Sequence, residues 1–233
     1  MLKQPQIFLL MKWGNFFSTT IGKKSMVAAS GIFLILFLVV HAGINACIFL
    51  NDGGETFNTV ASFMSHNWIM RFLELGLFVV LIAHFVQAMI IERKNRAARP
   101  VKYHFSQPNK NSKWYSRYMA IFGILILLFL IMHLSQFFIG TKEALYFEGD
   151  PYHDLYGEMQ EVFSHGWIVA LYLVGLIALF WHLLQGFQSA FHTLGLSHKK
   201  YAPIIKMMGT WYSVIIILLF ALMPLSMYFG WIS

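Results

Sequence analysis

The chain has 233 residues, of which 58% are hydrophobic, 17% aromatic and only 12% charged, a composition typical of integral membrane proteins rather than soluble domains. The formal net charge of +7 does not indicate nucleic-acid binding, because the basic residues lie in short loops between apolar runs. The single cysteine, Cys47, excludes an internal disulfide, a four-cysteine iron–sulfur site and covalent haem attachment through C-x-x-C-H.

Five apolar segments are long enough to cross a hydrocarbon core about 30 Å thick, which takes about 20 residues. They are predicted at residues 26–50, 68–91, 118–140, 166–194 and 204–230. The first is too long for the core of a signal peptide, so we expect it to be retained. The preceding stretch QIFLLMKWGNFF is predicted to be an interfacial helix. The expected fold is all-α, with a partly interfacial segment at 1–25 and a single five-helix transmembrane domain at 26–233.

The distribution of positive charge predicts the orientation. All but two of the 17 Lys and Arg residues lie in the amino-terminal segment, in the loop after the second span or in the loop after the fourth. The exceptions are Arg71 and Lys142. Because basic loops stay on the cytoplasmic side, we expect a cytoplasmic N-terminus and an outer C-terminus. The loop between the third and fourth spans is acidic and is interpreted as a solvated outer surface.

Two helix pairs share polar landmarks in the same order. The first span contains GIFLILFLVVH, ending at His41, and the third contains GILILLFLIMH, ending at His133. The second opens SHNWI and reaches His84, and the fourth opens SHGWI and reaches His182. We interpret the first four spans as two tandem helix-pair repeats, related by a pseudo-two-fold axis along the membrane normal. His41 should then face His133, and His84 should face His182.

Helical rise gives an independent estimate of the depth of these histidines. Counted from Lys24 and Arg117, His41 and His133 lie roughly 24 to 26 Å from the inner surface. Counted from Arg93, and from His192 or Gly195, His84 and His182 lie roughly 14 to 20 Å from it. An imidazole on each side of a flat macrocycle is the axial ligation of a haem iron. The sequence therefore predicts two b-type haems, an outer one held by His41 and His133 and an inner one held by His84 and His182.

Taken one at a time, these residues also allow purely structural interpretations. A lone membrane histidine is often an interhelical hydrogen-bonding group, and zinc would need four ligands close together. Gly186 and Ala88, four residues after a predicted ligand, leave room for a porphyrin edge or simply for helix packing. The other histidines singled out are interpreted as interfacial or solvated: His66, His153 and His165 on the outer side, and His104, His192 and His198 on the inner side.

With these residues in place, the chain resembles the five-helix dihaem cytochrome b subunit of succinate:quinone oxidoreductases, the bacterial succinate dehydrogenases and quinol:fumarate reductases. The resemblance covers all five spans, and HLLQGFQSAFHTLG, beginning at His182, is similar to the fourth helix of that family. In that family the first and third helices ligate the outer haem and the second and fourth the inner haem. Some members carry a glutamate, associated with proton movement, where this chain has Phe180.

The resemblance implies a membrane-anchor and electron-transfer subunit of a respiratory enzyme linked to the tricarboxylic acid cycle, in the bacterial cytoplasmic membrane. It implies a flavoprotein subunit with covalent FAD and an iron–sulfur subunit on the cytoplasmic face. The chain itself carries no visible dicarboxylate site. Electrons would pass between the iron–sulfur subunit, the two haems and a membrane quinone, menaquinone by resemblance to dihaem members. Whether the whole complex oligomerises, and in which direction it works, stay open.

Two kinds of further contact are weaker candidates. Glu74, ten residues outward of His84, could exchange protons with a quinone near the outer haem, or could form a helix ion pair with Arg71. Cations or donors near the surface could bind haem propionates. The candidates are Lys24, Arg93, Trp114 and Arg117.

Two rival functions remain. One is the b-type cytochrome subunit of a hydrogenase or nitrate reductase, although those proteins tend to place two ligands on one helix. The other is a haem-free transporter or channel whose histidines relay protons. Only the last span contains proline, Pro224, and no pair of broken helices of the transporter kind is visible.

Overall fold

The computed structural model describes residues 18–98, 112–148 and 153–232. The described chain is helical and contains no strand, and five of its helical segments are long and apolar enough to span a membrane. These spans are Thr20–Leu50, Trp68–Ala97, Met119–Phe147, Gly166–Thr193 and Ala202–Tyr228. The predicted all-α, five-helix membrane fold is thereby confirmed. The predicted interfacial helix lies outside the described residues.

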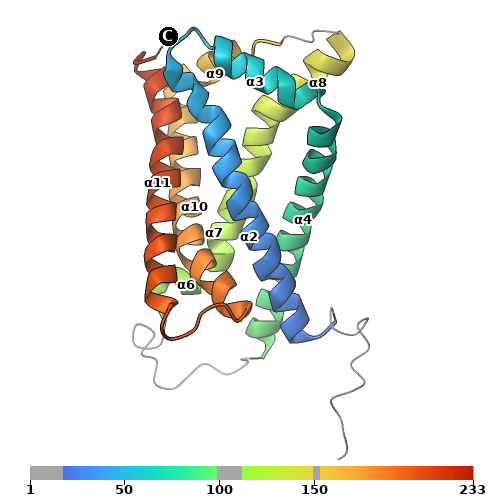
Figure 1. The fold of residues 1–233 in the computed structure, drawn as a ribbon, viewed down its shortest axis with the longest axis vertical. Helices are drawn as coiled ribbons and strands as arrows, with labels where there is room; N and C mark the ends of the chain where they lie inside the picture. Colours follow the sequence, from blue (N-terminus) through green and yellow to red (C-terminus); the bar gives the residue numbers. More distant parts are fainter. Residues whose placement is uncertain (1–17, 99–111, 149–152, 233) are drawn as a thin grey trace, which may run out of the picture.

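The spans are built from the following helices (Figure 1). The first consists of α2 (Thr20–Asn45) and the 3-10 turn η2 (Ala46–Leu50), and the second is α4 (Trp68–Ala97). The third begins after the short α6 (Trp114–Arg117) with α7 (Met119–His133), and continues through the π-helical η3 (Leu134–Ile139), α8 (Gly140–Glu143) and the π-helical η4 (Ala144–Glu148). The last two are α10 (Gly166–Thr193) and α11 (Ala202–Tyr228).

Two short helices, α3 (Glu55–His66) and α9 (Leu155–Phe163), lie across one end of the bundle, which we call the capped end (Figure 1). Each is amphipathic and buries one face. α3 buries Phe57, and α9 buries Tyr156, Met159 and Phe163. These side chains join one apolar cluster with residues of η2, α10 and α11, namely Ile48, Ile168, Val169, Tyr172 and Met223. A buried apolar cluster therefore lies under the cap.

Polar contacts fix the two cap helices to each other. The Asp154 carboxylate caps α9 by accepting the Gly157 N–H at 2.9 Å, and it also accepts the Asn58 side-chain N–H from α3 at 2.7 Å. The Asn58 carbonyl oxygen in turn accepts the Tyr156 N–H at 3.0 Å. Gly54 precedes α3 with φ +82° and lies directly against the Tyr156 ring, where a Cβ would collide.

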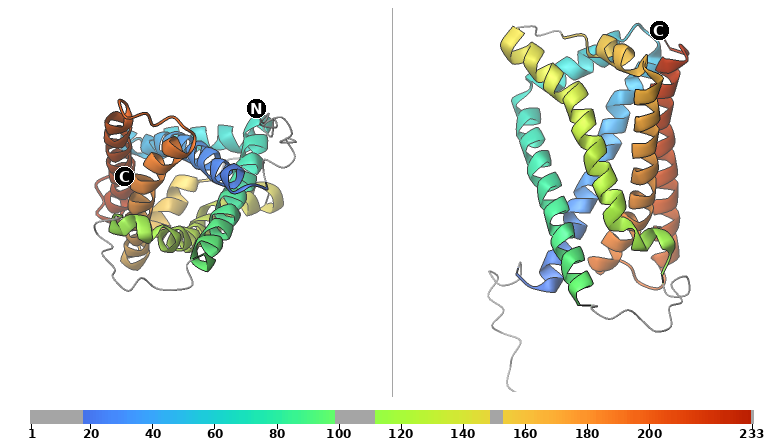
Figure 2. Two further views of the ribbon diagram at one scale, coloured as in Figure 1. Left: turned by 90° about the horizontal axis from the view of Figure 1, so that it is seen from below. Right: turned by 180° about the vertical axis from the view of Figure 1, so that it is seen from behind.

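Helix α10 is the centre of the bundle and packs against α11, α7 and α2. α4 packs mainly on α2 and has no buried residue. Viewed along the bundle, α2, α4, α7 and α10 surround its axis, and α11 lies outside them beside α10 (Figure 2). The Tyr212 hydroxyl ties α11 to α2 by donating to the Ile35 carbonyl at 2.7 Å. The first four spans thus enclose a shared interior.

The observed spans differ from the predicted ones mainly at three ends. The first begins at Thr20 rather than at residue 26, because the Thr19 hydroxyl caps the helix by accepting the Gly22 N–H at 3.0 Å. The second continues to Ala97 rather than stopping at residue 91, because α4 runs on through the basic residues that follow its apolar part. The third continues to Phe147 rather than stopping at residue 140. Its π-helical segments lie before and after Lys142, so the helix continues through this polar stretch. Hydropathy alone detects neither a cap nor a π-helical continuation.

Candidate histidine pairs within the helix bundle

The first pair joins the first and third spans. His41 lies one turn before the end of α2, and His133 is the last residue of α7. Their ring centroids are 5.8 Å apart, and the ring planes are nearly perpendicular at 84°. Phe37 stacks on His41 and Phe129 stacks on His133, each at an interplanar angle of 17°. The pair thus faces inward within an aromatic setting near the capped end.

The second pair joins the second and fourth spans. The centroids of His84 from α4 and His182 from α10 are 6.3 Å apart, with an interplanar angle of 72°. Each residue lies sixteen positions after the first residue of its helix, Trp68 or Gly166. The four histidines therefore meet in the two combinations that the sequence predicts.

Two glycines show that the pairs lie at different levels. A Cβ added to Gly31 of α2 would lie 3.4 Å from the His84 ring, and one added to Gly123 of α7 would lie 3.9 Å from the His182 ring. Both glycines precede a histidine of the other pair, His41 or His133, by ten residues. Ten residues of α-helix rise about 15 Å. The two pairs are therefore separated by about 15 Å along the bundle.

The spacing within each pair fits a metal bound between the rings. Two imidazoles on opposite sides of one metal, each with a nitrogen about 2.0 Å from it, have ring centroids roughly 6 Å apart. The observed 5.8 Å and 6.3 Å agree with this separation. Among the described residues no three His, Cys, Asp or Glu side chains come together at a metal site. Two ligands per site suit a macrocycle that supplies its own equatorial donors.

Two features beside the second pair favour a bound group there. A Cβ added to Gly186, one turn after His182, would meet only the terminal methyl group of Met119 within 4.0 Å. Two buried side-chain atoms there have no hydrogen-bond partner. They are Nδ1 of His182 and Oε1 of Gln87, which lies one turn after His84. Unpaired polar atoms inside a membrane bundle are costly, so their presence next to the histidines favours a bound group there.

Hydroxyl groups contact ring nitrogen Nδ1 of two histidines. Nδ1 of His84 lies 3.0 Å from Oγ of Ser30, which donates its own hydrogen to the Val27 carbonyl at 3.0 Å. Nδ1 of His133 lies 3.4 Å from the Tyr172 hydroxyl, which donates to Oε1 of Gln136 at 2.8 Å. Nδ1 of His41 lies 3.4 Å from the Asn45 amide nitrogen. Ser30, Tyr172 and Gln136 could not be predicted from the sequence, because their contacts cross between helices and leave no spacing signal.

Glu74 pairs with a residue other than the predicted one. Its carboxylate accepts from Nζ of Lys142 on α8 at 2.9 Å, and the side chains are 36% and 20% exposed, respectively. Arg71 instead donates to the Ser65 carbonyl at 3.2 Å and lies over the Tyr146 ring at 5.2 Å. The predicted ion pair of Glu74 with Arg71 is therefore replaced by a link between α4 and α8. The cation is Lys142, which comes from a different span. A spacing rule for residues three apart on one helix cannot predict such a contact.

The four candidate propionate contacts lie at the end opposite the cap. Lys24 is exposed in the first turns of α2, and Arg93 is exposed in the last turns of α4. Arg117 donates to the Ser112 carbonyl at 2.7 Å. Trp114 stacks edge to face on Trp181, the residue before His182, with centroids 4.6 Å apart. Trp114 is thus linked to the second histidine pair through Trp181.

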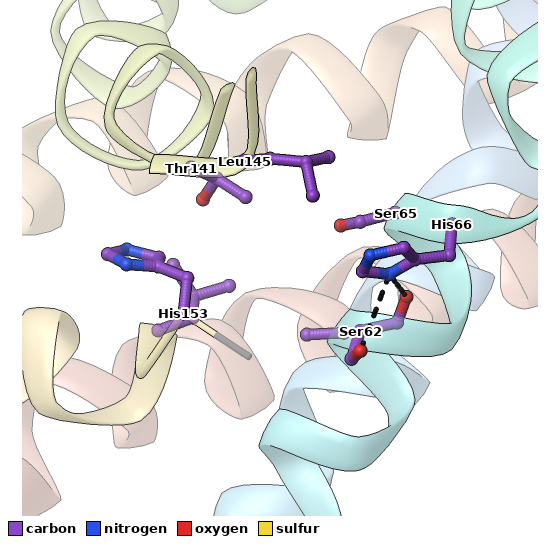
Figure 3. Close-up of a pocket in the computed structure, with 8 residues that line it drawn as sticks. Ser62, Ser65, His66, Thr141, Leu145 and His153 are labelled. Atoms are coloured by element: carbon purple, nitrogen blue, oxygen red, sulfur yellow. Dashed lines mark hydrogen bonds between the residues drawn. The ribbon is translucent and has the colours of Figure 1, made fainter. Parts of the chain in front are cut away.

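The remaining described histidines fit their interfacial interpretation. Around a small open pocket at the capped end, His66 of α3 and His153 before α9 stand on opposite sides, with Thr141 and Leu145 of the third span between them (Figure 3). Nδ1 of His66 lies 2.8 Å from the Ser62 carbonyl, and Nε2 of His153 lies 2.9 Å from the Glu158 carboxylate. His165 directly precedes α10, His192 lies in its last turn, and His198 lies in the loop between α10 and α11. His104 falls outside the described residues.

No family model, curated protein or solved structure matches this chain. Its membrane fold and its two histidine pairs are therefore the basis for assigning a function.

Proposed function

We propose that the protein is the membrane-anchor and electron-transfer subunit of a succinate:quinone oxidoreductase, with two bis-histidine b haems. The observation that carries this proposal is the meeting of four histidines, one from each of four helices, as two pairs about 15 Å apart along the bundle. Unrelated structural histidines have no reason to match in both partner and level. The cofactor would supply one-electron chemistry at each pair.

The protein's residues then have defined tasks. His41 and His133 would hold one iron, and His84 and His182 would hold the other. Phe37 and Phe129 stack on the first pair of rings and limit their rotation. Gly31 and Gly123 lie next to the rings of His84 and His182, and their lack of a side chain leaves room for these rings. The apolar side chains of the bundle around both sites would influence the reduction potentials.

The partners follow from the resemblance and from the charge of the loops. The basic loops at the end opposite the cap would face the cytoplasm and carry the iron–sulfur and flavoprotein subunits. The quinone would react at the capped end, near the His41–His133 pair. Glu74 and the pocket beside His66 and His153 lie at that end. Glu74 is the candidate proton donor or acceptor.

Two quantities in the purified protein test the proposal. We expect about two haem b groups per chain, extractable in acidified solvent because no cysteine motif binds them covalently. We also expect tagged protein from the native membrane to bring with it a subunit carrying covalent flavin and a second subunit carrying iron–sulfur clusters.

The same experiment separates the rivals. Haem without a flavin-bearing partner would favour the cytochrome subunit of another respiratory oxidoreductase. A chain purified without haem would favour the proton-relay transporter and would contradict the proposal.

A further inference from the structure

Each histidine pair contains one ring whose Nδ1 touches a hydroxyl oxygen, and that hydroxyl has already used its hydrogen elsewhere. Ser30 of α2 donates to the carbonyl of Val27, one turn back on its own helix, at 3.0 Å. Tyr172 of α10 donates to Oε1 of Gln136 at 2.8 Å. A hydroxyl has one hydrogen to donate and lone pairs to accept with. Toward the histidine, each of these oxygens can therefore act only as an acceptor.

This arrangement selects one tautomer of each ring. Nδ1 of His84, 3.0 Å from Ser30, must carry the proton, and so must Nδ1 of His133, 3.4 Å from Tyr172. In a neutral imidazole the other nitrogen, Nε2, is then unprotonated and is free to bind a metal. An acceptor behind the distant nitrogen also raises the basicity of a ligating imidazole.

The second member of each pair lacks such a hydroxyl. Nδ1 of His182 contacts no hydroxyl. The residue before Gly123 in α7 is Phe122, where α2 has Ser30 before Gly31. Tyr172 precedes His182 by ten residues, and the residue ten before His84 is Glu74, which pairs with Lys142. The Nδ1 neighbour of His41 is the Asn45 amide nitrogen. The two otherwise similar halves thus place one hydroxyl at each pair, on opposite halves.

We propose that Ser30 and Tyr172 are positioning residues for the two metal centres. Ser30 orients His84 and tunes the centre shared by His84 and His182, and Tyr172 orients His133 and tunes the centre shared by His41 and His133. Each hydroxyl contacts a histidine that would bind the metal, and neither contacts the metal itself. Greater electron donation from the imidazole favours ferric over ferrous iron, so each hydroxyl lowers the potential of its own centre. This inference rests on the proposed function.

The test is an equilibrium redox titration of purified protein, followed optically, with ferric electron paramagnetic resonance as the second readout. Each haem is first assigned by its loss in His84→Ala or His41→Ala. Ser30→Val and Ser30→Thr have similar shapes, but only threonine keeps a hydroxyl. Tyr172→Phe removes only the phenolic oxygen. The matched controls are Ser213→Ala and Tyr212→Phe, because both hydroxyls are bonded to backbone carbonyls at 2.7 Å and neither contacts a histidine nitrogen.

In Ser30→Val we expect the ferrous-to-ferric ratio of the His84–His182 haem, measured at the wild-type midpoint, to rise between about threefold and tenfold, the latter being about 59 mV for one electron. Ser30→Thr should stay near wild type. Tyr172→Phe should raise the ratio of the His41–His133 haem only, and the controls should change neither. If Ser30→Val loses its haem while Ser30→Thr retains it, the positioning role is supported as well.

Unchanged potentials and ferric spectra in haem-loaded Ser30→Val and Tyr172→Phe would overturn the inference and leave the proposed function standing. Equal shifts of both haems in either variant would also overturn it, since they would indicate a general effect on packing. A wild-type protein without haem would overturn the proposed function, and this inference with it.

Discussion

Gly31 and Gly123 allow the second histidine pair to lie against the helices that carry the first. An added Cβ at Gly31 would already lie 3.4 Å from the His84 ring, so a larger side chain must displace the ring. We predict that Gly31→Leu disrupts the His84–His182 site and loses the haem bound there while the other haem is retained. Haem quantitation with reduced-minus-oxidised spectra measures this.

Gly43 of the same helix provides the control, because an added Cβ there meets no atom within 4 Å. Gly43→Leu should keep both haems. If Gly31→Leu also keeps both haems with unaltered spectra, the close approach of Gly31 to the His84 site is contradicted.

Some residues of the candidate site could be predicted from the sequence and others could not. His41, His84, His133 and His182 could be predicted, because an imidazole is rare in an apolar run and these four recur at matched positions. Ser30 could not, because a serine in a membrane helix ordinarily bonds to its own backbone, as Ser30 also does with Val27. Its contact with His84 depends on how α2 and α4 cross, which no single-helix pattern contains.

Among the helices, α9 depends on Asp154 at its N-terminus. Its hydrogen bonds to the Gly157 N–H and the Asn58 side chain hold the pKa of the Asp154 carboxyl below its usual 3.8. The bonded, ionised form therefore stabilises the fold at pH values above 3.8, and this contribution is lost as the pH falls through the lowered pKa. We predict that Asp154→Ala weakens α9 by about 1 kcal/mol at pH 7 and that the difference from wild type closes below pH 3.8.

Hydrogen exchange of α9 peptides, compared between wild type and variant at each pH, measures this difference. Glu161→Ala changes an exposed acid of the same helix and should have little effect at any pH. A ratio of exchange rates that is the same at neutral and acidic pH would show that the Asp154 charge does not stabilise the cap.

Helices α4 and α8 are linked by the ion pair of Glu74 with Lys142. Partly exposed ion pairs contribute about 0.2–1 kcal/mol. We predict a coupling free energy in the upper part of this range for a double-mutant cycle of Glu74→Gln and Lys142→Met, because the Lys142 side chain is only 20% exposed. Thermal unfolding of the two single variants and the double variant gives the coupling.

The ion pair of Glu92 with Arg96, one turn apart on α4, is the comparison, since the Arg96 side chain is 70% exposed. Its cycle should give a smaller coupling. A coupling of Glu74 with Lys142 no larger than that of Glu92 with Arg96 would contradict a structural role for the link between helices.

Long apolar helices could be predicted from hydropathy, whereas the cap helices could not. α3 and α9 contain 12 and 9 residues, and their amphipathic patterns are too short to stand out beside five spans. They are stable because Phe57 and Tyr156 bury against the bundle. The π-helical turns after His133 were equally hidden, because they change hydrogen bonding without changing composition.

For the molecule as a whole, the charge distribution predicts which end faces outward. We expect the capped end to lie outside and the loop between α10 and α11 to lie in the cytoplasm. In a Cys47→Ala background, Glu161→Cys at the capped end and Lys199→Cys in that loop place exposed thiols at opposite ends. A membrane-impermeant maleimide added to intact cells should label the first and spare the second. The reverse pattern would contradict the predicted orientation.

The five-span fold could be predicted from composition. The relation between the two predicted helix pairs depends on which histidines and glycines contact each other across the bundle. The tandem repeat stays a prediction. The contacts of Gly31 with His84 and of Gly123 with His182 are the pattern that such a repeat would produce. Ser30 and Tyr172 do not occupy equivalent positions of the two predicted repeats. Only the assembled bundle reveals their contacts with the histidines, because each hydroxyl comes from one span and its histidine from another.

The central claim is that two histidine pairs each hold one haem. It is tested most directly by reduced-minus-oxidised spectra with haem quantitation on wild type and on the four single variants His41→Ala, His84→Ala, His133→Ala and His182→Ala. We predict two spectrally distinct haems, one lost or altered in both His41→Ala and His133→Ala, the other in both His84→Ala and His182→Ala. A variant of one pair that removes the haem of the other pair, or a wild-type protein without haem, would contradict the account.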